Sequence, residues 1–340
     1  MFWAVRRKGL PGRYAELRPR WDTLRHARDV LQARRAKVAQ GMYEGSADAI
    51  TPLLAERYSP AQVWSASRLE SYGACPQMFY IGTALRLEAK GPPELGLDAS
   101  QIGTILHKIL EDVYRNAANP ADPESVLALL PQVAKQVFGS APQEYGFRPS
   151  ALWKVEQAQF LAALELTITA LAEEGQDWTP FAYEQTFGIE DSPPLVVDLA
   201  GESLRLHGVI DRLDRNSQGG IRVVDYKTGG SHLAQNDLKD GRRLQLPIYA
   251  LAARDALGLG EPADGIYWKI LAAAAGSLKL AKFKTEELQG PEAAYQVVRE
   301  HLLRIITGIR AGNFSPAVPK GGCASYCPAA QWCWRFEPGW

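Results

Sequence analysis

The stretch Val223-Val224-Asp225-Tyr226-Lys227-Thr228-Gly229 brings a carboxylate and an ammonium group to the end of a β-branched run. Valine favours strands, and successive side chains of a strand point to opposite faces, so Asp225 and Lys227 are predicted to share one face. A carboxylate binds a hard divalent cation, and a lysine beside it steadies a charged phosphate or an attacking hydroxide. Such a pair can therefore form half of a metal-dependent phosphodiesterase site. Asp-x-Lys alone is common by chance, and a solvated strand end running into a Gly-Gly turn gives the same pattern.

The overall composition is that of an ordinary globular chain. Its 340 residues are 46% hydrophobic and 22% charged, with a net charge of zero. No apolar run approaches the roughly 20 residues of a membrane span, and no segment resembles a signal peptide, so we predict a cytoplasmic protein without a membrane partner. The charge is unevenly distributed, because residues 1–40 hold 11 Lys/Arg against three Asp/Glu. The basic segment Arg6–Lys37 can meet a phosphate backbone or an acidic partner surface, and a solvated helical face is the alternative.

Hydrophobic periodicity predicts helices, then a run of strands, then alternating helices and strands. Helices are predicted over Trp21–Gln40, from the capping box Ser67-Arg68-Leu69-Glu70 towards Cys75, and over Ile102–Ala117, Ala151–Glu174, Arg243–Ala256 and Glu292–Ala311. Strands are predicted over Phe181–Ile189, Leu195–Leu199, Leu204–Arg215, Ile221–Tyr226, Gly265–Leu271 and Leu278–Phe283. This order indicates an α/β or α+β fold with helical flanks. We expect a basic helical segment with a linker at 41–56 over residues 1–60, and one domain over residues 61–340.

Two further motifs can supply ligands to the same metal. The sequence Gly-Val-Ile-Asp211-Arg212 lies near the end of a predicted strand, and the following turn would bring Asp211 beside Asp225 on the neighbouring strand. Two carboxylates on adjacent strands can share a divalent cation. An ion pair with Arg212 is the simpler explanation for Asp211 taken alone. In Gly-Thr-Ile-Leu-His107, the histidine flanks the apolar stripe of a predicted helix and can add an imidazole, although a histidine in such a place is usually structural.

Polar side chains on the next helix and on an earlier strand can join this group. Gln245 and Tyr249 stand at i and i+4, so they share one face of a helix that follows the Asp-x-Lys strand. They can contact a DNA strand or orient Lys227, and an ordinary amphipathic helix is the alternative. Glu184 is an acidic residue within a β-type run, and it is a further candidate member of the site.

The chain has four cysteines, Cys75, Cys323, Cys327 and Cys333. Their number allows two disulfides, but a cytoplasmic chain argues against them. The C-x3-C-x5-C tail suggests a metal clip with one distant ligand. Four thiolates suit either zinc or an iron–sulfur cluster, and spacing does not choose between them. Unrelated buried thiols are the third possibility.

In combination, these motifs resemble a known family of nucleases. The segment Ser65–Pro76 is similar to the opening of an AddB-type nuclease domain. The motifs at Gly103–His107, Gly208–Asp211, Asp225–Lys227 and Gln245–Tyr249 resemble, in order, those of RecB-family nucleases of the PD-(D/E)XK superfamily. The resemblance covers about residues 60–335, and it implies a restriction-endonuclease-like core with a mixed sheet flanked by helices.

The resemblance also implies a role for each motif residue. Mg²⁺ or Mn²⁺ would be bound by His107, Asp211, Asp225 and the backbone carbonyl of Tyr226. Lys227 would be the catalytic lysine, and Gln245 and Tyr249 would lie next to it. The cysteine tail resembles the iron–sulfur staple of AddB and of CRISPR-adaptation nucleases. A 4Fe–4S cluster would thus be held by four ligands and join the N- and C-terminal parts of the domain: Cys75, Cys323, Cys327 and Cys333.

The tail departs from the family in one respect. The family usually spaces its last three cysteines C-x2-C-x5-C, whereas this chain has C-x3-C-x5-C. The extra residue falls between Cys323 and Cys327, and it leaves zinc or an empty site open.

The function implied is that of a metal-dependent DNA exonuclease that prefers single-stranded DNA or frayed ends and works with a helicase in double-strand-break processing. The chain lacks a Gly-x4-Gly-Lys-Ser/Thr loop, so ATP-driven unwinding would come from a partner or from a longer parent protein. Two alternatives remain. One is a CRISPR-adaptation nuclease that trims short DNA. The other is a non-catalytic DNA-binding or helicase scaffold, whose expected sign is loss of a core ligand, and no core ligand is missing here.

Overall fold

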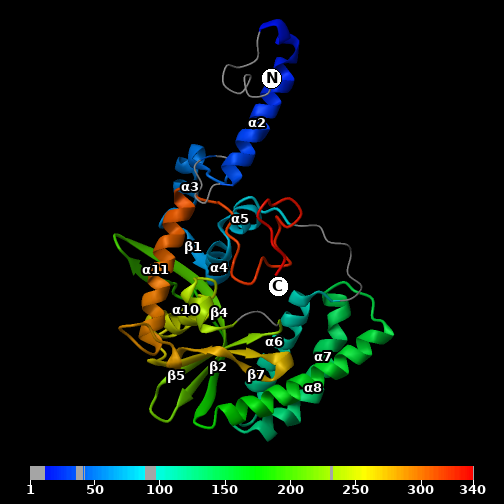
Figure 1. Ribbon diagram of the computed structural model, residues 1–340. Helices are drawn as coiled ribbons and strands as arrows, with labels where there is room; N and C mark the ends of the chain where they lie inside the picture. The colour runs from blue at the N-terminus through cyan, green and yellow to red at the C-terminus, as the bar shows by residue number, and fades with distance from the viewer. Residues whose placement is uncertain (1–11, 36–40, 42, 89–96, 230–232, 340) are drawn as a thin grey trace.

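The computed structural model describes residues 12–35, 41, 43–88, 97–229 and 233–339 (Figure 1). This part of the chain forms a seven-stranded mixed sheet flanked by helices, which confirms the predicted fold class. The strands are β1 Val63–Ser65, β2 Trp178–Phe187, β3 Leu195–Leu199, β4 Glu202–Asn216, β5 Ile221–Lys227, β6 Pro262–Lys269 and β7 Ala274–Lys279. The helices are α2 Arg18–Arg34, α3 Thr51–Arg57, α4 Ala66–Ala74, α5 Pro76–Phe79, α6 Ala99–Asn116, α7 Pro123–Glu144, α8 Ala151–Glu174, α9 Gln235–Lys239, α10 Gln245–Leu251 and α11 Pro291–Arg310.

Strand β4 is the centre of the sheet, because four other strands pair with it. Its first part pairs with β3 antiparallel and with β1 parallel, up to His207. Its second part, from Gly208, pairs antiparallel with β2, and the last residues also pair with β5. The sheet then continues through a parallel β5–β6 pair to the antiparallel strand β7. Both halves of the sheet are thus built on a single strand.

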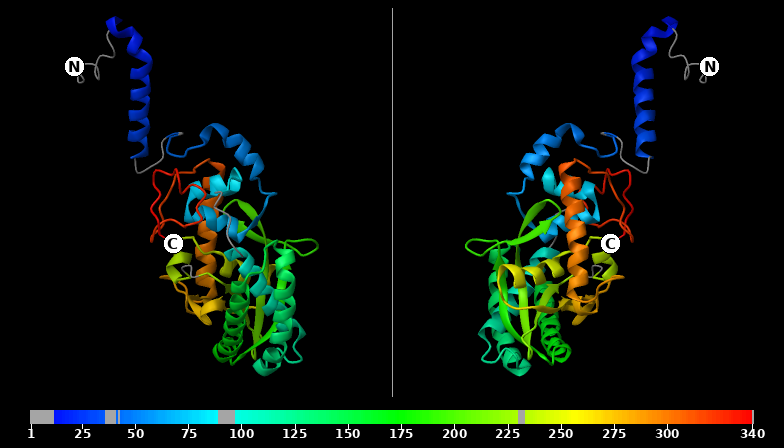
Figure 2. Two further views of the ribbon diagram at one scale, coloured as in Figure 1. Left: turned by 90° about the vertical axis from the view of Figure 1, so that its right-hand side faces the viewer. Right: turned by 90° about the vertical axis from the view of Figure 1, so that its left-hand side faces the viewer.

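Helices cover both faces of the sheet (Figures 1 and 2). One face packs against α6, α7 and α8, and the other packs against α10 and α11. Strand β5 divides its side chains between these two cores: Val224 and Tyr226 join the first, while Ile221 and Val223 join the second. The β5 residues are nearly all buried, as expected for a strand covered on both sides.

The N-terminal part only partly follows the sequence-based prediction. Helix α2 projects beyond the rest of the protein and has no buried side chain (Figure 1). It ends at Arg34, and residues 36–40 of the predicted helix lie outside the described residues. The predicted linker at 41–56 is wrong over its second half, because it contains most of α3, and Leu54 of that helix is buried in the main core. A boundary near residue 60 stays a proposal.

Two other elements differ from the sequence-based prediction. Strand β7 lies at Ala274–Lys279 rather than at Leu278–Phe283, because the apolar residues Leu280 and Phe283 reach the core from a 3₁₀ turn. Helix α7 was not predicted at all. It contains Pro131 and Pro142, which normally argue against a helix interior.

Candidate functional site

The candidate site forms where β4 and β5 separate. Their paired ladder stops at Arg212 and Val224, one residue before Asp211 on β4 and Asp225 on β5. Beyond that point the side chain of Asp211 replaces the ladder, because its Oδ2 accepts the N–H of Tyr226 at 2.7 Å. The separation therefore brings the two carboxylates together at the strand ends, as predicted.

Asp225 and Lys227 lie on one face of β5, which confirms the alternation argument. Lys227 Nζ lies 2.5 Å from Asp225 Oδ2 and donates to Gln245 Oε1 at 2.9 Å. Gln245 in turn donates its Nε2 hydrogen to the hydroxyl of Tyr249 at 2.9 Å. Burial lowers the pKa of Lys227, but the charges of Asp225 and Asp211 outweigh burial and raise it. The lysine is thus a fixed cation held by the α10 side chains.

Close approach of α10 to the sheet depends on Gly208. A Cβ at this position would lie 2.9 Å from the rings of Phe187 and Tyr249. The glycine of the Gly-x-x-Asp motif thus makes room for Tyr249 three residues before Asp211.

His107 reaches the same place from α6. Its Nδ1 lies 3.6 Å from Asp211 Oδ2, and Gly103 one turn earlier lets α6 approach Thr228, since a Cβ there would be 3.3 Å from the threonine Oγ1. Burial lowers the pKa of His107, and the charge of Asp225 offsets this only in part. The ring is therefore held neutral, which is the form that binds metals.

Glu184 joins the group from β2. A ligand atom from each of His107, Glu184 and Asp211 lies within 4.8 Å of the others. Glu184 has a φ of +47°, a left-handed conformation that is rare for a non-glycine residue in a strand and often found at functional sites. Burial and the charge of Glu111 raise its pKa to about 7. The structure thus places Glu184, the least certain sequence candidate, beside His107 and Asp211.

Asp211 is not paired with Arg212, so that alternative is wrong. Arg212 is buried on the other side of the strand, where its Nε donates to Asp214 Oδ1 at 2.5 Å. Arg222 binds the second oxygen of Asp214. Asp211 is therefore free of this ion-pair network, and burial together with the charge of Asp225 raises its pKa well above the usual range.

Glu70 is a residue of the site that sequence reasoning missed. The N-cap of α4 is Ser65, whose Oγ accepts the N–H of Arg68, so the predicted Ser67 capping box is wrong. Glu70 instead turns inward, and its Oε1 accepts the N–H groups of Leu244 (2.6 Å) and Gln245 (2.8 Å) at the start of α10. It thereby fixes the helix that orients Lys227. A buried carboxylate facing a helix start gives no signal in the sequence.

The donor set fits a divalent cation. Asp225 Oδ1 is buried and has no hydrogen-bond donor among the described residues, so this oxygen lacks a partner that a cation would supply. Two or three carboxylates with one neutral imidazole are hard and intermediate ligands of the kind that Mg²⁺ or Mn²⁺ accepts. The predicted role of the Tyr226 carbonyl stays a prediction.

The four cysteines gather although 248 positions separate Cys75 from Cys323. All four line one cavity between the α4–α5 junction and the C-terminal tail, and none forms a disulfide. Cys75 Sγ accepts the N–H of Ala317 at 3.4 Å, and Cys333 lies 3.4 Å from Gln77 Oε1. Among the described residues, no three cysteine sulfurs lie within 4.8 Å of one another.

A comparison with protein families assigns the fold and its motifs. The family model described as the PD-(D/E)XK nuclease superfamily matches residues 63–334. The chain belongs to the PD-(D/E)XK nuclease superfamily. The match runs from β1 into the cysteine tail, so it spans every element that contributes to the site, as the motif resemblance had predicted.

Curated relatives of this PD-(D/E)XK chain are each named as a subunit of an ATP-dependent helicase/deoxyribonuclease. The protein of Carboxydothermus hydrogenoformans is 32% identical over 234 residues, which cover 63% of this chain and 21% of that protein. The protein of Moorella thermoacetica is 28% identical over 293 residues, which cover 77% of this chain and 24% of that protein. The chain thus spans about a fifth to a quarter of the length of these relatives. No helix of the described residues is both long and apolar enough to cross a membrane.

Proposed function

We propose that the chain hydrolyses phosphodiester bonds of DNA with Mg²⁺ or Mn²⁺, as an exonuclease of the AddB/RecB type. The observation that carries this proposal is the meeting of Asp211, Asp225 and His107 beside the held cation of Lys227, with a buried carboxylate oxygen that has no donor among the described residues. Membership of the PD-(D/E)XK superfamily supports the reaction type.

Some residues of the site would bind the cation, and Lys227 would stabilise charge. His107, Asp211 and Asp225 would hold the cation, and Glu184 lies within reach of it. When bound, the cation supplies Lewis acidity towards a phosphate oxygen and lowers the pKa of water. Lys227 lies beside Asp225 and donates a hydrogen bond to Gln245, so its ammonium group is placed to stabilise the charge that develops on the phosphate.

The preferred substrate is single-stranded DNA or a frayed end. The sequence contains no Walker-type loop with which to unwind a duplex. Relatives carry the words helicase and deoxyribonuclease in one name, which supports a helicase partner or a helicase within a longer protein. Recognition of a single strand rests on backbone charge and base stacking, so binding should tolerate any sequence and weaken with salt.

We further propose that the cysteines hold a 4Fe–4S cluster. All four thiols line one cavity and none forms a disulfide, which is the arrangement that a cluster held by four thiolates needs. Zinc remains the alternative that metal analysis of anaerobically purified protein would reveal.

The decisive experiment uses purified protein with end-labelled single-stranded DNA in Mg²⁺, in Mn²⁺ and in EDTA. We expect mononucleotides or short products with either metal and intact DNA in EDTA. A matched duplex with blunt ends should be cut far more slowly. Equal cleavage in EDTA would refute metal dependence, and equal rates on both substrates would refute the substrate preference.

A further inference from the structure

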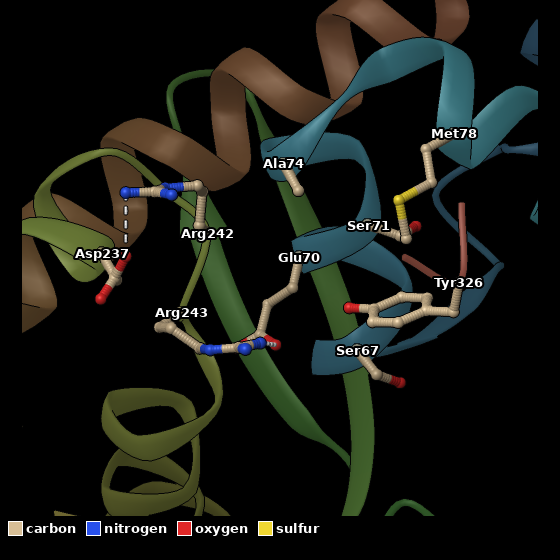
Figure 3. A pocket seen from close by; sticks show the side chains of 9 residues that line it. All are labelled: Ser67, Glu70, Ser71, Ala74, Met78, Asp237, Arg242, Arg243 and Tyr326. Carbon is tan, nitrogen blue, oxygen red and sulfur yellow. Dashed lines mark hydrogen bonds and ion pairs between the residues drawn. The ribbon is translucent and has the colours of Figure 1, made fainter. Parts of the chain in front are cut away.

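A pocket of about 240 Å³ opens beside the start of α10, outside the metal site (Figure 3). Helix α4 contributes Ser67 and Glu70, the α4–α5 region contributes Met78, and the loop before α10 contributes Arg243. The cysteine tail closes the pocket with Tyr326. Three segments that are far apart in the sequence thus build one cavity next to the start of α10.

The charges of this pocket are already paired, which bears on what it can bind. Arg242 Nη2 lies 2.8 Å from Asp237 and 3.2 Å from Asp240. Arg243 Nη1 lies 3.4 Å from Glu70 Oε2. Among the described residues that line the pocket, cations are not in excess over carboxylates, so a phosphate dianion would find little net attraction. A neutral group with polar edges suits the pocket better.

The pocket surface is aromatic on one side and polar on the other. Tyr326 is 61% exposed, and its phenol oxygen points into the pocket towards Glu70 and Arg243 (Figure 3). Met78 adds a polarizable thioether, and Ser67 adds a hydroxyl. A nucleobase has both properties that this surface suits: a flat ring that stacks on an aromatic face, and an edge that forms hydrogen bonds.

Tyr326 comes from the cysteine tail. It lies immediately before Cys327 in the loop Cys323-Ala-Ser-Tyr326-Cys327. This loop thus carries the aromatic side chain that lines the pocket.

The pocket adjoins the residues that hold Lys227. Glu70, which lines the pocket, accepts the N–H of Gln245 at 2.8 Å, and Gln245 Oε1 accepts a hydrogen bond from Lys227 at 2.9 Å. We infer that the pocket binds one base of a single-stranded DNA substrate, next to the residues that would act on the cleaved bond, with Tyr326 as the stacking surface. The inference rests on the proposed function.

The test is an abasic scan of a short labelled oligonucleotide with the intact protein. One base at a time is removed, and the dissociation constant is measured in EDTA, where cleavage does not occur. We expect one position to weaken binding by roughly 5- to 150-fold, the range of a single stacked base, and its neighbours to change little. A flat profile would overturn the inference.

Variants at Tyr326 then assign the position to the pocket. Tyr326→Phe keeps the ring and should preserve the position-specific loss, whereas Tyr326→Leu should abolish it, so that the base and the side chain are coupled in a double-mutant cycle. Trp332→Leu is the matched control, since Trp332 is also an exposed aromatic of the tail (54%) and does not line the pocket. Additive effects of Tyr326→Leu and base removal would refute the assignment.

Two further measurements separate the pocket from the proposed activity. Absence of cleavage in Mg²⁺ and Mn²⁺, together with a peaked abasic profile, would refute the nuclease proposal and leave the base pocket standing. Cleavage with a flat profile would refute the pocket alone. A neutral methylphosphonate linkage removes the phosphate charge at this position. If that change raises the dissociation constant while base removal does not, the pocket binds phosphate and the inference is overturned.

Discussion

Replacing Glu70 should separate the role of its carboxylate as a hydrogen-bond acceptor from the role of its charge. Its Oε1 accepts two backbone N–H groups at the start of α10, those of Leu244 and Gln245, and its Oε2 faces Arg243. Glu70→Ala leaves both amides without an acceptor in a buried place, while Glu70→Gln keeps an oxygen of the same reach and removes only the charge.

The expected costs follow from these contacts. Each buried group left without a partner costs about 1–3 kcal/mol, so Glu70→Ala should lower the free energy of unfolding by about 2–6 kcal/mol. Burial raises the pKa of Glu70 despite the charge of Arg243, which means that the fold gains little from the ionised form. Glu70→Gln should therefore cost only about 1 kcal/mol or less.

Urea unfolding measures both values from the shift of the midpoint at a constant slope. Glu165→Ala is the control, because Glu165 is an exposed helical glutamate of α8, and its loss should stay within about 0.5 kcal/mol. A Glu70→Ala cost below about 1 kcal/mol, or equal costs for the two Glu70 variants, would refute the capping role. Cleavage should fall in the alanine variant as well, since Gln245 would no longer be positioned to hold Lys227.

Four further outcomes are expected. Lys227→Ala should reduce the cleavage rate by orders of magnitude, at about 1.4 kcal/mol per tenfold, while DNA binding in EDTA survives; full activity would contradict its role. Asp211→Asn should abolish cleavage yet raise the Tm of the metal-free protein, because it removes a buried charge beside another carboxylate; a lower Tm would count against this reasoning. Cys333→Ser should lower both iron content and Tm, and unchanged iron would exclude it as a ligand. Burial lowers the pKa of His301, so an unfolded histidine with a pKa of about 6.5 takes up its proton first. Stability from His301 is thus complete above that pH and falls as the pH drops towards the lowered folded pKa, and His301→Asn should flatten this part of the stability profile.

Local patterns predicted the sheet and the placement of several candidate site residues, because both depend on period and order along the chain. Asp225 and Lys227 share a face by strand alternation alone, and Gln245 and Tyr249 share a face by helical spacing. Gly208 lies three residues before Asp211, where Tyr249 packs against the strand and leaves no room for a Cβ. Only the structure shows this contact.

Contacts between distant segments were beyond prediction. Glu70 belongs to a local S-x-x-E pattern, yet it binds amides 174 and 175 positions away, because burial of the helix start outweighs the exposed capping arrangement. Helix α7 was not predicted because the packing of Val126, Leu130 and Phe138 outweighs the cost of two internal prolines. Long-range burial, rather than propensity, decided these cases.

The sharing of β4 by both halves of the sheet has a mechanical consequence. A strand of 15 residues extends about 50 Å, and it joins the part that pairs with β1 and β3 to the part that carries Asp211 without an intervening loop. We therefore expect no jaw-like closure between these parts, so the substrate must adapt its own shape to a stiff surface. Duplex DNA resists bending over about 150 base pairs, whereas a single strand bends at every nucleotide. For the proposed DNA substrate, we therefore expect this stiffness to favour single strands over duplex DNA.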